Sequence, residues 1–261
     1  MRLVFAAHAE REASAAACRR LMQTAESAGF RCSVLDRAHP PIDDGDTMLV
    51  AVGGDGNFIR TAHVACAAGL PVFGVNFGHV GFLTERTEDD FEEALFCIRS
   101  GAYCIEARSM ISASVNGKSA HDCLNDLLIY KKSFSGVTRI AFSIDGMPAG
   151  DLSGDGIVVA TATGATGYSL SAGGPIVADG LDAMVITPIC AHTLQFRPIV
   201  ASMDAEIAMR MNDGGFLAAD GDRFCTVESG DVVTVRKSAH AVRLVTFKAR
   251  NLFRLIAQKL T

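Results

Sequence analysis

The chain has 261 residues, of which 49% are hydrophobic and 20% charged, so the composition is that of a globular protein and excludes a disordered chain. Its formal net charge is −5, its isoelectric point is about 5.8 and its mean hydropathy is +0.25. Lysines and arginines are scattered without a basic stripe, so nucleic acid and anionic membranes are poor candidates for partners.

The first hundred residues alternate between strand and helix patterns. Short apolar runs predict strands at 3–7, 30–35, 48–52 and 71–75. Helical patterns cover 9–28 and 57–69. Gly29 can end the first helix in a left-handed cap, and Thr87 with Asp90 forms a capping box for a further helix that ends near Gly101. This alternation indicates βαβ units and a parallel sheet.

From about residue 108 the pattern changes to short strands separated by turn dipeptides. These dipeptides are Asn116-Gly117, Asp145-Gly146 and Asp220-Gly221. Their residues tolerate the positive φ of tight hairpin turns, so the second half is predicted to be mainly antiparallel β. A helical pattern returns only at 250–260. We therefore predict an α/β domain over residues 1–107 and a β-rich domain over residues 108–242.

No targeting or membrane segment is predicted. The first apolar run covers only residues 3–7, which is too short for a signal-peptide core, and no run approaches the roughly 18 residues that span a membrane. The eight cysteines include no C-x-x-C pair, so neither a zinc knuckle nor a dithiol motif is indicated. We expect a cytoplasmic protein whose thiols are reduced and mostly buried.

The first candidate site is Gly53-Gly54-Asp55-Gly56, between a predicted strand and a predicted helix. Glycines let the backbone turn tightly and approach a ligand, and a helix N-terminus favours anions, so phosphate is the indicated ligand. Because a carboxylate repels phosphate, Asp55 could hold a metal ion or take a proton from an attacking hydroxyl. The alternative is that Asp55 only caps the helix. The P-loop and protein-kinase motifs are missing, and no G-x-G-x-x-G follows the first strand.

A second segment, Asn76-Phe77-Gly78-His79-Val80-Gly81-Phe82-Leu83, follows the next predicted strand. Open α/β sheets bind ligands at the carboxyl ends of their strands. The segment is therefore either a ligand-binding loop or a connection whose glycines serve only the path of the chain.

A third candidate is the pair Asn125 and Asp126, which interrupts an apolar run at 124–129. A buried Asp needs partners, and a carboxylate accepts well from the two hydroxyls of a ribose diol. A β-bulge or a sheet edge would explain the pair without a ligand, and the sequence leaves both interpretations open.

The longest candidate begins at Gly154-Asp155-Gly156 and continues, after a strand at 157–160, through small and hydroxylated residues at 161–175. Such a backbone lets a flat ligand approach closely. Tyr168 supplies a ring for stacking, and the Thr and Ser residues supply hydrogen bonds. Low complexity would also give small residues, but Tyr168 and the preceding strand favour a binding segment.

In this order the four segments resemble the NAD kinase family, whose pattern is GGDG, N-x-G-x-x-G-F-L, an N-E dipeptide, and D-G followed by T-x-T-G-S-T-A-Y-S-L-S-A-G-G-P. The resemblance covers residues from about 48 to 224. It implies an α/β domain plus a β-rich domain, with the segment at about 243–261 packing back on the first. It further implies transfer of the γ-phosphoryl group of ATP to the 2′-hydroxyl of the adenosine ribose of NAD, with Mg²⁺ or another divalent cation, in a homodimer or homotetramer.

The resemblance also implies the site residues. Asp55 matches the catalytic base, Asn125 and Asp126 match the pair that holds adenine and ribose, and Asp155 matches an Asp that reaches the nicotinamide end, of its own or of a neighbouring subunit's ligand. The full dinucleotide-binding set is Asp55, Gly56, Arg60, Asn125, Asp126, Asp155, Thr163, Thr166, Gly167, Tyr168, Ser169, Leu170 and Ser171. None is assigned to a resident metal ion.

Five positions depart from the family pattern. Asp126 replaces Glu, and Ala165 and Gly167 replace Ser and Ala. Ser153 stands where many members carry a basic residue, and Asp222 stands where a ligand-binding Gln is common. We expect these changes to alter affinity and not to abolish activity.

Two rival functions are consistent with parts of this pattern. A lipid kinase of the diacylglycerol or sphingosine type would share GGDG but not the Tyr168 segment. A non-catalytic dinucleotide sensor would keep Asn125, Asp126 and the Tyr168 segment but would not need Asp55.

Overall fold

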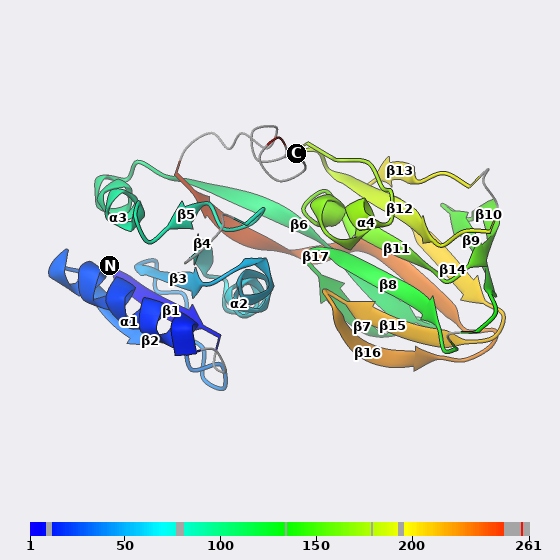
Figure 1. The fold of residues 1–261 in the computed structure, drawn as a ribbon, viewed down its shortest axis with the longest axis horizontal. Helices are drawn as coiled ribbons and strands as arrows, with labels where there is room; N and C mark the ends of the chain where they lie inside the picture. The colour runs from blue at the N-terminus through cyan, green and yellow to red at the C-terminus, as the bar shows by residue number, and fades with distance from the viewer. Residues whose placement is uncertain are drawn as a thin grey trace. The chain divides into compact units, whose positions relative to one another are not determined.

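A computed structural model describes residues 1–8, 12–76, 81–133, 135–178, 180–192, 196–247 and 257 (Figure 1). The chain folds as two compact units. Unit 1 contains Met1–Arg108 and the segment that begins at Ala241, and unit 2 contains Ser109–His240. No helix among the described residues is long and apolar enough to cross a membrane.

Unit 1 is built on a parallel sheet. Its elements are β1 (Arg2–Ala7), α1 (Glu12–Ser27), β2 (Arg31–Val34), β3 (Thr47–Val52), α2 (Asp55–Ala68), β4 (Pro71–Asn76), β5 (Arg86–Thr87) and α3 (Phe91–Ser100). The strands pair in the order β2-β1-β3-β4, and the short β5 pairs with the end of β4; all these pairs are parallel. The end of β17 (Val232–Thr246) also runs parallel to β4, with Arg243 opposite Pro71. The predicted parallel α/β sheet is confirmed.

Helices cover both faces of this sheet, which is why β3 and β4 are buried along their whole length. Side chains alternate across a strand, so Leu3 and Val50 share a core with buried residues of α1 and α3. Phe58 of α2 lies against the opposite face, where Gly74 leaves room for its ring. Because β1, β3 and β4 run parallel to one another, the loops that follow them lie at one edge of the sheet.

The capping box predicted for α3 forms only in part. Thr87 N–H donates to Asp90 Oδ1 at 2.6 Å, but the Thr87 hydroxyl donates to the same carboxylate at 3.1 Å instead of accepting from the Asp90 N–H. Because α3 begins at Phe91, its N-cap is Asp90. The pair therefore stabilises the turn before the helix. The left-handed glycine predicted after α1 is confirmed at Gly29, where φ is 86°.

Unit 2 is antiparallel, as predicted. Its elements are β6 (Cys104–Val115), which starts in unit 1, then β7 (Lys118–Cys123), β8 (Asp126–Lys131), β9 (Thr138–Ile144), β10 (Met147–Gly154), β11 (Gly156–Thr161), η1 (Gly164–Thr166), α4 (Tyr168–Ser171), β12 (Ala183–Ile189), β13 (Ile199–Ser202), β14 (Ile207–Met211), β15 (Gly215–Ala219), β16 (Asp222–Val227) and most of β17. One sheet has the strand order β13-β12-β11-β8-β15-β16. A second set pairs in the order β10-β9-β14-β17, with β6 and β7 as a further hairpin.

The three turn dipeptides form the predicted tight turns. The φ angles are 51° and 70° at Asn116-Gly117, 51° and 75° at Asp145-Gly146, and 49° and 89° at Asp220-Gly221. Positive φ at both central residues matches the right-handed twist of the flanking strands, which explains the preference for Asn or Asp followed by Gly.

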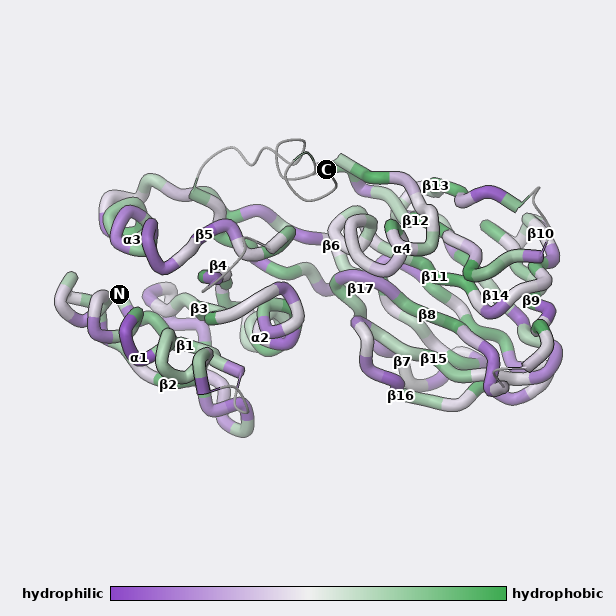
Figure 2. Tube along the Cα trace, viewed as in Figure 1, coloured by the Kyte–Doolittle hydropathy of each residue, from purple (hydrophilic) through white to green (hydrophobic). Residues whose placement is uncertain are grey.

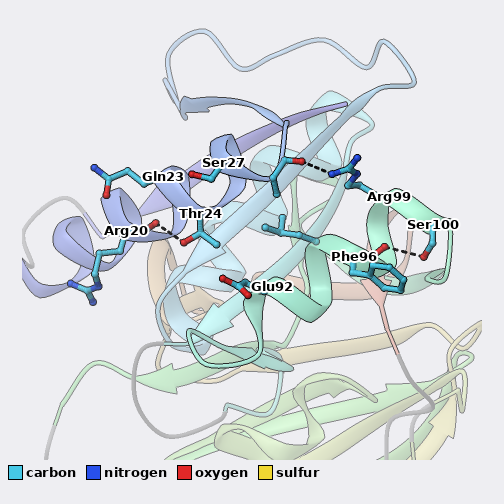
Figure 3. A pocket seen from close by; sticks show the side chains of 10 residues that line it. Arg20, Gln23, Thr24, Ser27, Glu92, Phe96, Arg99 and Ser100 are labelled. Atoms are coloured by element: carbon cyan, nitrogen blue, oxygen red, sulfur yellow. Dashed lines mark hydrogen bonds between the residues drawn. The ribbon is translucent and has the colours of Figure 1, made fainter.

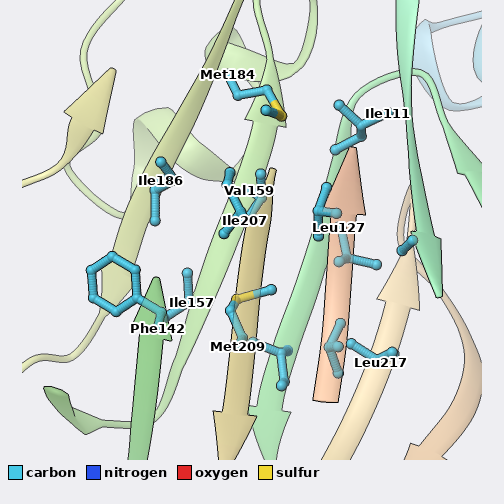
Figure 4. Packing of buried hydrophobic residues seen from close by; sticks show 14 of the residues in the cluster. Ile111, Leu127, Phe142, Ile157, Val159, Met184, Ile186, Ile207, Met209 and Leu217 are labelled. Atoms are coloured by element: carbon cyan, nitrogen blue, oxygen red, sulfur yellow. The ribbon is translucent and has the colours of Figure 1, made fainter. Parts of the chain in front are cut away.

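The core of unit 2 lies between its sheets. Figure 4 shows Val159 and Ile186 from one sheet beside Phe142, Ile207 and Met209 from the other, all of them buried. Strands β8 and β11 are hydrophobic along much of their length (Figure 2). A packed core of this kind holds the ends of β8 and β11 rigidly, and the candidate site of unit 2 begins at these ends.

The eight cysteines, all in the described part of the chain, carry free thiols. Only Cys18 and Cys123 are fully buried, whereas Cys104 and Cys190 are exposed, so the prediction of mostly buried thiols is wrong. Cys104 begins a strand and Cys190 sits in a turn with φ of 47°, where the chain leaves the core. Of the helix predicted at 250–260, all residues but Ala257 lie outside the described residues.

Candidate functional site

The glycine-rich turn joins β3 to α2 in unit 1. Gly53 has φ of 138°, a value that favours glycine, and it lets the chain leave the buried strand. The N-cap of α2 is Gly54, and no side chain caps the helix. Asp55 therefore does not cap its own helix, which removes the alternative left open by the sequence.

The Asp55 carboxylate is held by the backbone of the loop after β4. Phe82 N–H donates to Oδ2 at 2.8 Å, and Leu83 N–H donates to Oδ1 at 3.0 Å. A methyl group on Gly81 would collide with Oδ1, so glycine is required there. Part of the second candidate segment thus lies against the first, while residues 77–80 of that segment lie outside the described residues.

Gly54 and Gly56 have no packing partner among the described residues. A methyl group built on either one would meet no atom within 4 Å, and neither residue has a positive φ. Neither sterics nor backbone conformation therefore requires glycine at these positions. Gly54 is the N-cap, where glycine is common, but glycine is disfavoured inside a helix, so Gly56 in the first turn of α2 is the position that a ligand approaching the backbone would explain.

The turn also lies beside the point where the strand order reverses. From β1 the chain moves to β2 on one side and then to β3 on the other. Ligands of open α/β sheets bind outside the carboxyl ends of the strands at such a point. Arg60, in contrast, is exposed on α2, about 140° around the helix from Asp55, and no described contact joins the two side chains.

In unit 2, Asn125 and Asp126 lie where β8 begins, next to the end of β11. Thr161 N–H donates to the Asn125 carbonyl at 2.8 Å, and the Thr161 hydroxyl donates to the Leu124 carbonyl at 2.6 Å. Gly164 packs so tightly on Asn125 that a methyl group would collide with its carbonyl. The third and fourth candidate segments are therefore in direct contact, as a shared site requires.

Asp220, which the sequence indicated only as a turn residue, holds the backbone at residues 124–126, where β8 begins. Its Oδ2 accepts from Leu124 N–H at 2.8 Å, and its Oδ1 accepts from Asn125 N–H at 2.7 Å and from Asp126 N–H at 3.2 Å. Its own N–H donates to the Asp126 carbonyl at 2.9 Å. No sequence pattern indicates these contacts, because the two segments are more than 90 residues apart.

Burial affects both Asn125 and Asp126, and a neighbouring charge also shifts the pKa of Asp126. Asp126 is only 8% exposed, and its burial, together with the Asp220 carboxylate, raises its pKa to about 7, although the Tyr168 N–H favours the charged form. The Asn125 Oδ1 atom is buried and has no hydrogen-bond donor among the described residues. An orphaned acceptor and a perturbed carboxyl group, side by side, are typical of a binding site.

The segment at 163–171 is only partly available to a ligand. Gly167 is close to both site side chains: a methyl group there would lie 3.6 Å from Asn125 Nδ2 and from Asp126 Oδ2. Tyr168 is 45% exposed, whereas Ser169 is fully buried and its hydroxyl pairs with that of Thr187 at 2.8 Å. Of the other residues predicted to bind the dinucleotide in this segment, Thr163, Thr166 and Leu170 are half-buried and Ser171 is exposed.

The structure does not bring Asp155 close to Asn125 and Asp126. Asp155 precedes β11, whereas Thr161 ends it, so the strand separates the two by roughly 20 Å. The Asp155 carboxylate forms an ion pair with Lys131 at 2.6 Å.

A groove in unit 1 lies away from the glycine-rich turn. It has a volume of about 1010 Å³ and runs between α1 and α3 (Figure 3). Phe96 is 70% exposed beside it, and Arg99 donates to the Ala28 carbonyl at 2.7 Å. It contains none of the predicted site residues.

Two family models match the chain, one for each half. The ATP-NAD kinase N-terminal domain matches residues 4–103, and the ATP-NAD kinase C-terminal domain matches residues 124–247. The chain belongs to the NAD kinase family. It is an enzyme, a phosphotransferase with the activity of an NAD kinase. The matches favour this function over the two rivals, a lipid kinase and a non-catalytic dinucleotide sensor.

Relatives and solved structures of the family agree. The NAD kinase of Magnetococcus marinus is 36% identical over 253 residues, which cover 93% of this chain and 84% of the relative. That of Geobacter sulfurreducens is 38% identical over 239 residues, covering 89% and 83%. The NAD kinase of Archaeoglobus fulgidus in complex with ATP matches 100% of this chain and 98% of its own, with a TM-score of 0.80 and 25% identity. Yeast NADH kinase complexed with NADH shows the same fold, with a TM-score of 0.85, 22% identity, and coverage of 100% and 87%.

Proposed function

We propose that this NAD kinase transfers the γ-phosphoryl group of ATP to the 2′-hydroxyl of the adenosine ribose of NAD, with Asp55 as the general base. Asp55 takes the hydroxyl proton, the 2′ oxygen forms a bond to the γ phosphorus, and the bond from that phosphorus to the bridging oxygen breaks to release ADP. Such a transfer depends mainly on positioning and charge neutralisation.

The observation that carries this assignment is the position of the Asp55 carboxylate. It is half-buried, lies at a turn whose glycines leave the backbone open, and accepts one N–H on each oxygen. A carboxylate oxygen has a second lone pair, so both oxygens retain the capacity to accept a hydroxyl proton. The two N–H donors fix the carboxylate without consuming its basic sites.

Unit 2 supplies the groups that suit a dinucleotide. The orphaned Asn125 Oδ1 can accept from an amino group of a base, and Asp126 can accept from a ribose diol. The exposed ring of Tyr168 offers a surface for stacking. The remaining members of the set proposed from the sequence, including Arg60 and Asp155, stay predictions.

A divalent cation would enter mainly as the complex of ATP. Mg²⁺ commonly uses one or two carboxylates together with substrate phosphates. The described residues hold no cluster of three or more metal-ligating side chains, so the ATP phosphates would hold most of such an ion, beside the Asp55 carboxylate at the glycine-rich turn. When bound, the cation would neutralise charge on the triphosphate. The cytoplasmic location and the homodimeric or homotetrameric state expected from the sequence also remain predictions.

The direct test is to incubate the protein with NAD and ATP-Mg²⁺ and to detect NADP with an NADP-specific dehydrogenase. Asp55→Asn should lower kcat by at least roughly 10²-fold, the contribution of a general base, while calorimetry still detects NAD binding. Asp36→Asn, in an exposed loop of the same unit, is the matched control and should keep full activity. Near-normal turnover of Asp55→Asn would refute the assignment.

A further inference from the structure

Three consecutive backbone N–H groups converge on the Asp220 carboxylate. They belong to Leu124, Asn125 and Asp126, and their distances to the carboxylate oxygens are 2.7–3.2 Å. Successive N–H groups of this kind form a concave anion site, which here is filled by a side chain of the protein itself. The β15–β16 turn therefore fixes the path of the chain just before β8.

The same carboxylate places a negative charge beside Asp126. On either side of β8, the residues in the facing positions are apolar, Ala160 of β11 opposite Asp126 and Ala219 of β15 opposite Leu127. From α4, the Tyr168 N–H donates to the Asp126 carboxylate.

The neighbouring titratable group on β7 is the Cys123 thiol, which is fully buried. Burial and the carboxylates of Asp220, Asp126 and Asp122 raise its pKa well above its ordinary value, so it stays neutral near pH 7. Among the charged groups of the described chain, Asp220 is the one whose charge disfavours ionisation of Asp126.

We propose that Asp220 is a positioning residue with two effects: it holds Asn125 and Asp126 in place for the dinucleotide, and its charge adds to the burial of Asp126 in moving to higher pH the range in which Asp126 can bind a ribose diol. This inference rests on the proposed function, since it takes NAD as the ligand of unit 2. Asp220 itself need not touch NAD, because it acts through the backbone and the carboxylate of its neighbours.

The sign of the pH effect follows from the hydrogen-bond chemistry. An ionised carboxylate accepts from both hydroxyls of a diol, whereas the protonated form loses one of these acceptors. Because the pKa of Asp126 is raised to about 7, the ionised fraction grows about tenfold between about pH 6 and about pH 8. The affinity for NAD should increase by about the same factor over this range.

Calorimetric titration of the full chain with NAD at the two pH values tests the charge effect. The wild-type Kd should fall about tenfold from about pH 6 to about pH 8. That of Asp220→Asn should fall by a smaller factor, about fourfold or less, since removing the neighbouring charge lets Asp126 ionise at lower pH while its burial, the larger cause of the raised pKa, remains. A pH-independent wild-type Kd, or an Asp220→Asn variant with the wild-type slope, would overturn this effect.

The positioning effect is read at about pH 8, where Asp126 is mostly ionised in both proteins. In the Asp220→Asn variant, the side-chain amide oxygen can still accept from Asn125 and Asp126, but the bond from Leu124 N–H is lost. We expect NAD to bind about threefold to tenfold more weakly to this variant, with a corresponding rise in KM and little change in kcat. An unchanged Kd at this pH would overturn the positioning role.

Asp145→Asn is the matched control. Asp145 has nearly the same φ as Asp220, precedes a glycine in the same way, and accepts a backbone N–H, that of Glu206, at 2.8 Å. It should keep the wild-type pH slope. If Asp220→Asn does not fold, Asp126→Asn provides the second test, because it removes the titrating group and should give a flat pH profile; a full slope in that variant would overturn the proposal.

The readouts separate this inference from the proposed function. A protein that binds NAD with the expected slope but forms no NADP would refute the proposed function and leave the inference standing. A protein that forms NADP but binds NAD without a pH slope would refute the charge effect alone. A protein that does not bind NAD would refute both.

Discussion

Glycines in the two candidate regions face opposite surroundings. In the turn of unit 1, a methyl group on Gly54 or Gly56 would meet no atom of the described chain within 4 Å. In unit 2, a methyl group on Gly164 would collide with the Asn125 backbone, and one on Gly174 would overlap the Ser169 hydroxyl. The fold requires glycine at Gly164 and Gly174, whereas at Gly56 the described residues give neither a steric nor a conformational reason for it.

The acidic residues of the two regions differ in the same way. Asp55 is half-buried and held by two backbone N–H donors from a neighbouring loop. Asp126 is buried beside Asp220, which raises its pKa to about 7. The region in unit 1 is therefore open around a fixed carboxylate, whereas the region in unit 2 is closely packed around a carboxyl group that is costly to ionise. Stability and activity should respond differently to substitutions in the two regions.

The largest effect is expected for Gly164→Ala. Its methyl group must displace the backbone of Asn125, which is anchored by Thr161 and Asp220, so the cost is that of an overpacked core with little room to relax. We expect a loss of about 3 kcal/mol or more in the free energy of unfolding, measured by denaturant titration. A loss below about 1 kcal/mol would mean that this region is no more tightly packed than the turn in unit 1.

A smaller effect of opposite sign is expected for Asp126→Asn. A raised pKa means that the wild-type carboxyl group contributes its full stability below about pH 4, its ordinary value, and loses it as the pH rises through about 7. Asn cannot ionise and so avoids this loss. The rise in pKa from about 4 to about 7 sets an upper limit of about 4 kcal/mol on the difference. Allowing for solvent that still reaches the carboxyl group, the variant should be more stable than wild type by roughly 2–3 kcal/mol at about pH 8, with little difference at about pH 4.

Thermal unfolding across this pH range would measure the difference between the two proteins. Asp145→Asn, in an exposed turn of the same unit, is the control. If Asp126→Asn gains no stability between about pH 4 and about pH 8, burial of this carboxyl group carries no cost. The contrast with Asp55 would then disappear.

The smallest effect on stability, and the sharpest test of the open turn, is expected for Gly56→Ala. Alanine fits the helical backbone at this position without a clash, so the ligand-free protein should gain about 0.5–1 kcal/mol. The methyl group would occupy space that a substrate needs, so kcat/KM should fall by about tenfold or more, a cost of about 1.4 kcal/mol. Denaturant titration and the NADP assay measure the two quantities, and unchanged kcat/KM would show that no substrate approaches this backbone.

Much of the fold could be predicted because it depends on local chemistry. The alternation of strands and helices, the left-handed Gly29 and the three turn dipeptides are each specified by residues close together in sequence. Two features were not predictable in this way. The exposure of Cys104 depends on where its strand leaves the core, and α3 begins only at Phe91 because Thr87 belongs to β5, which pairs with the distant β4.

By itself, the sequence determined the family, the two-part organisation and the identity of the residues with unusual chemistry, since each rests on motifs of a few adjacent residues. Only the tertiary structure decided which of them meet. It set the Phe82 and Leu83 amides against Asp55, made Asp220 the anchor of Asn125 and placed Asp155 at the far end of β11. Contacts between segments up to 96 residues apart depend on strand order and register, which the whole core fixes and no local pattern encodes.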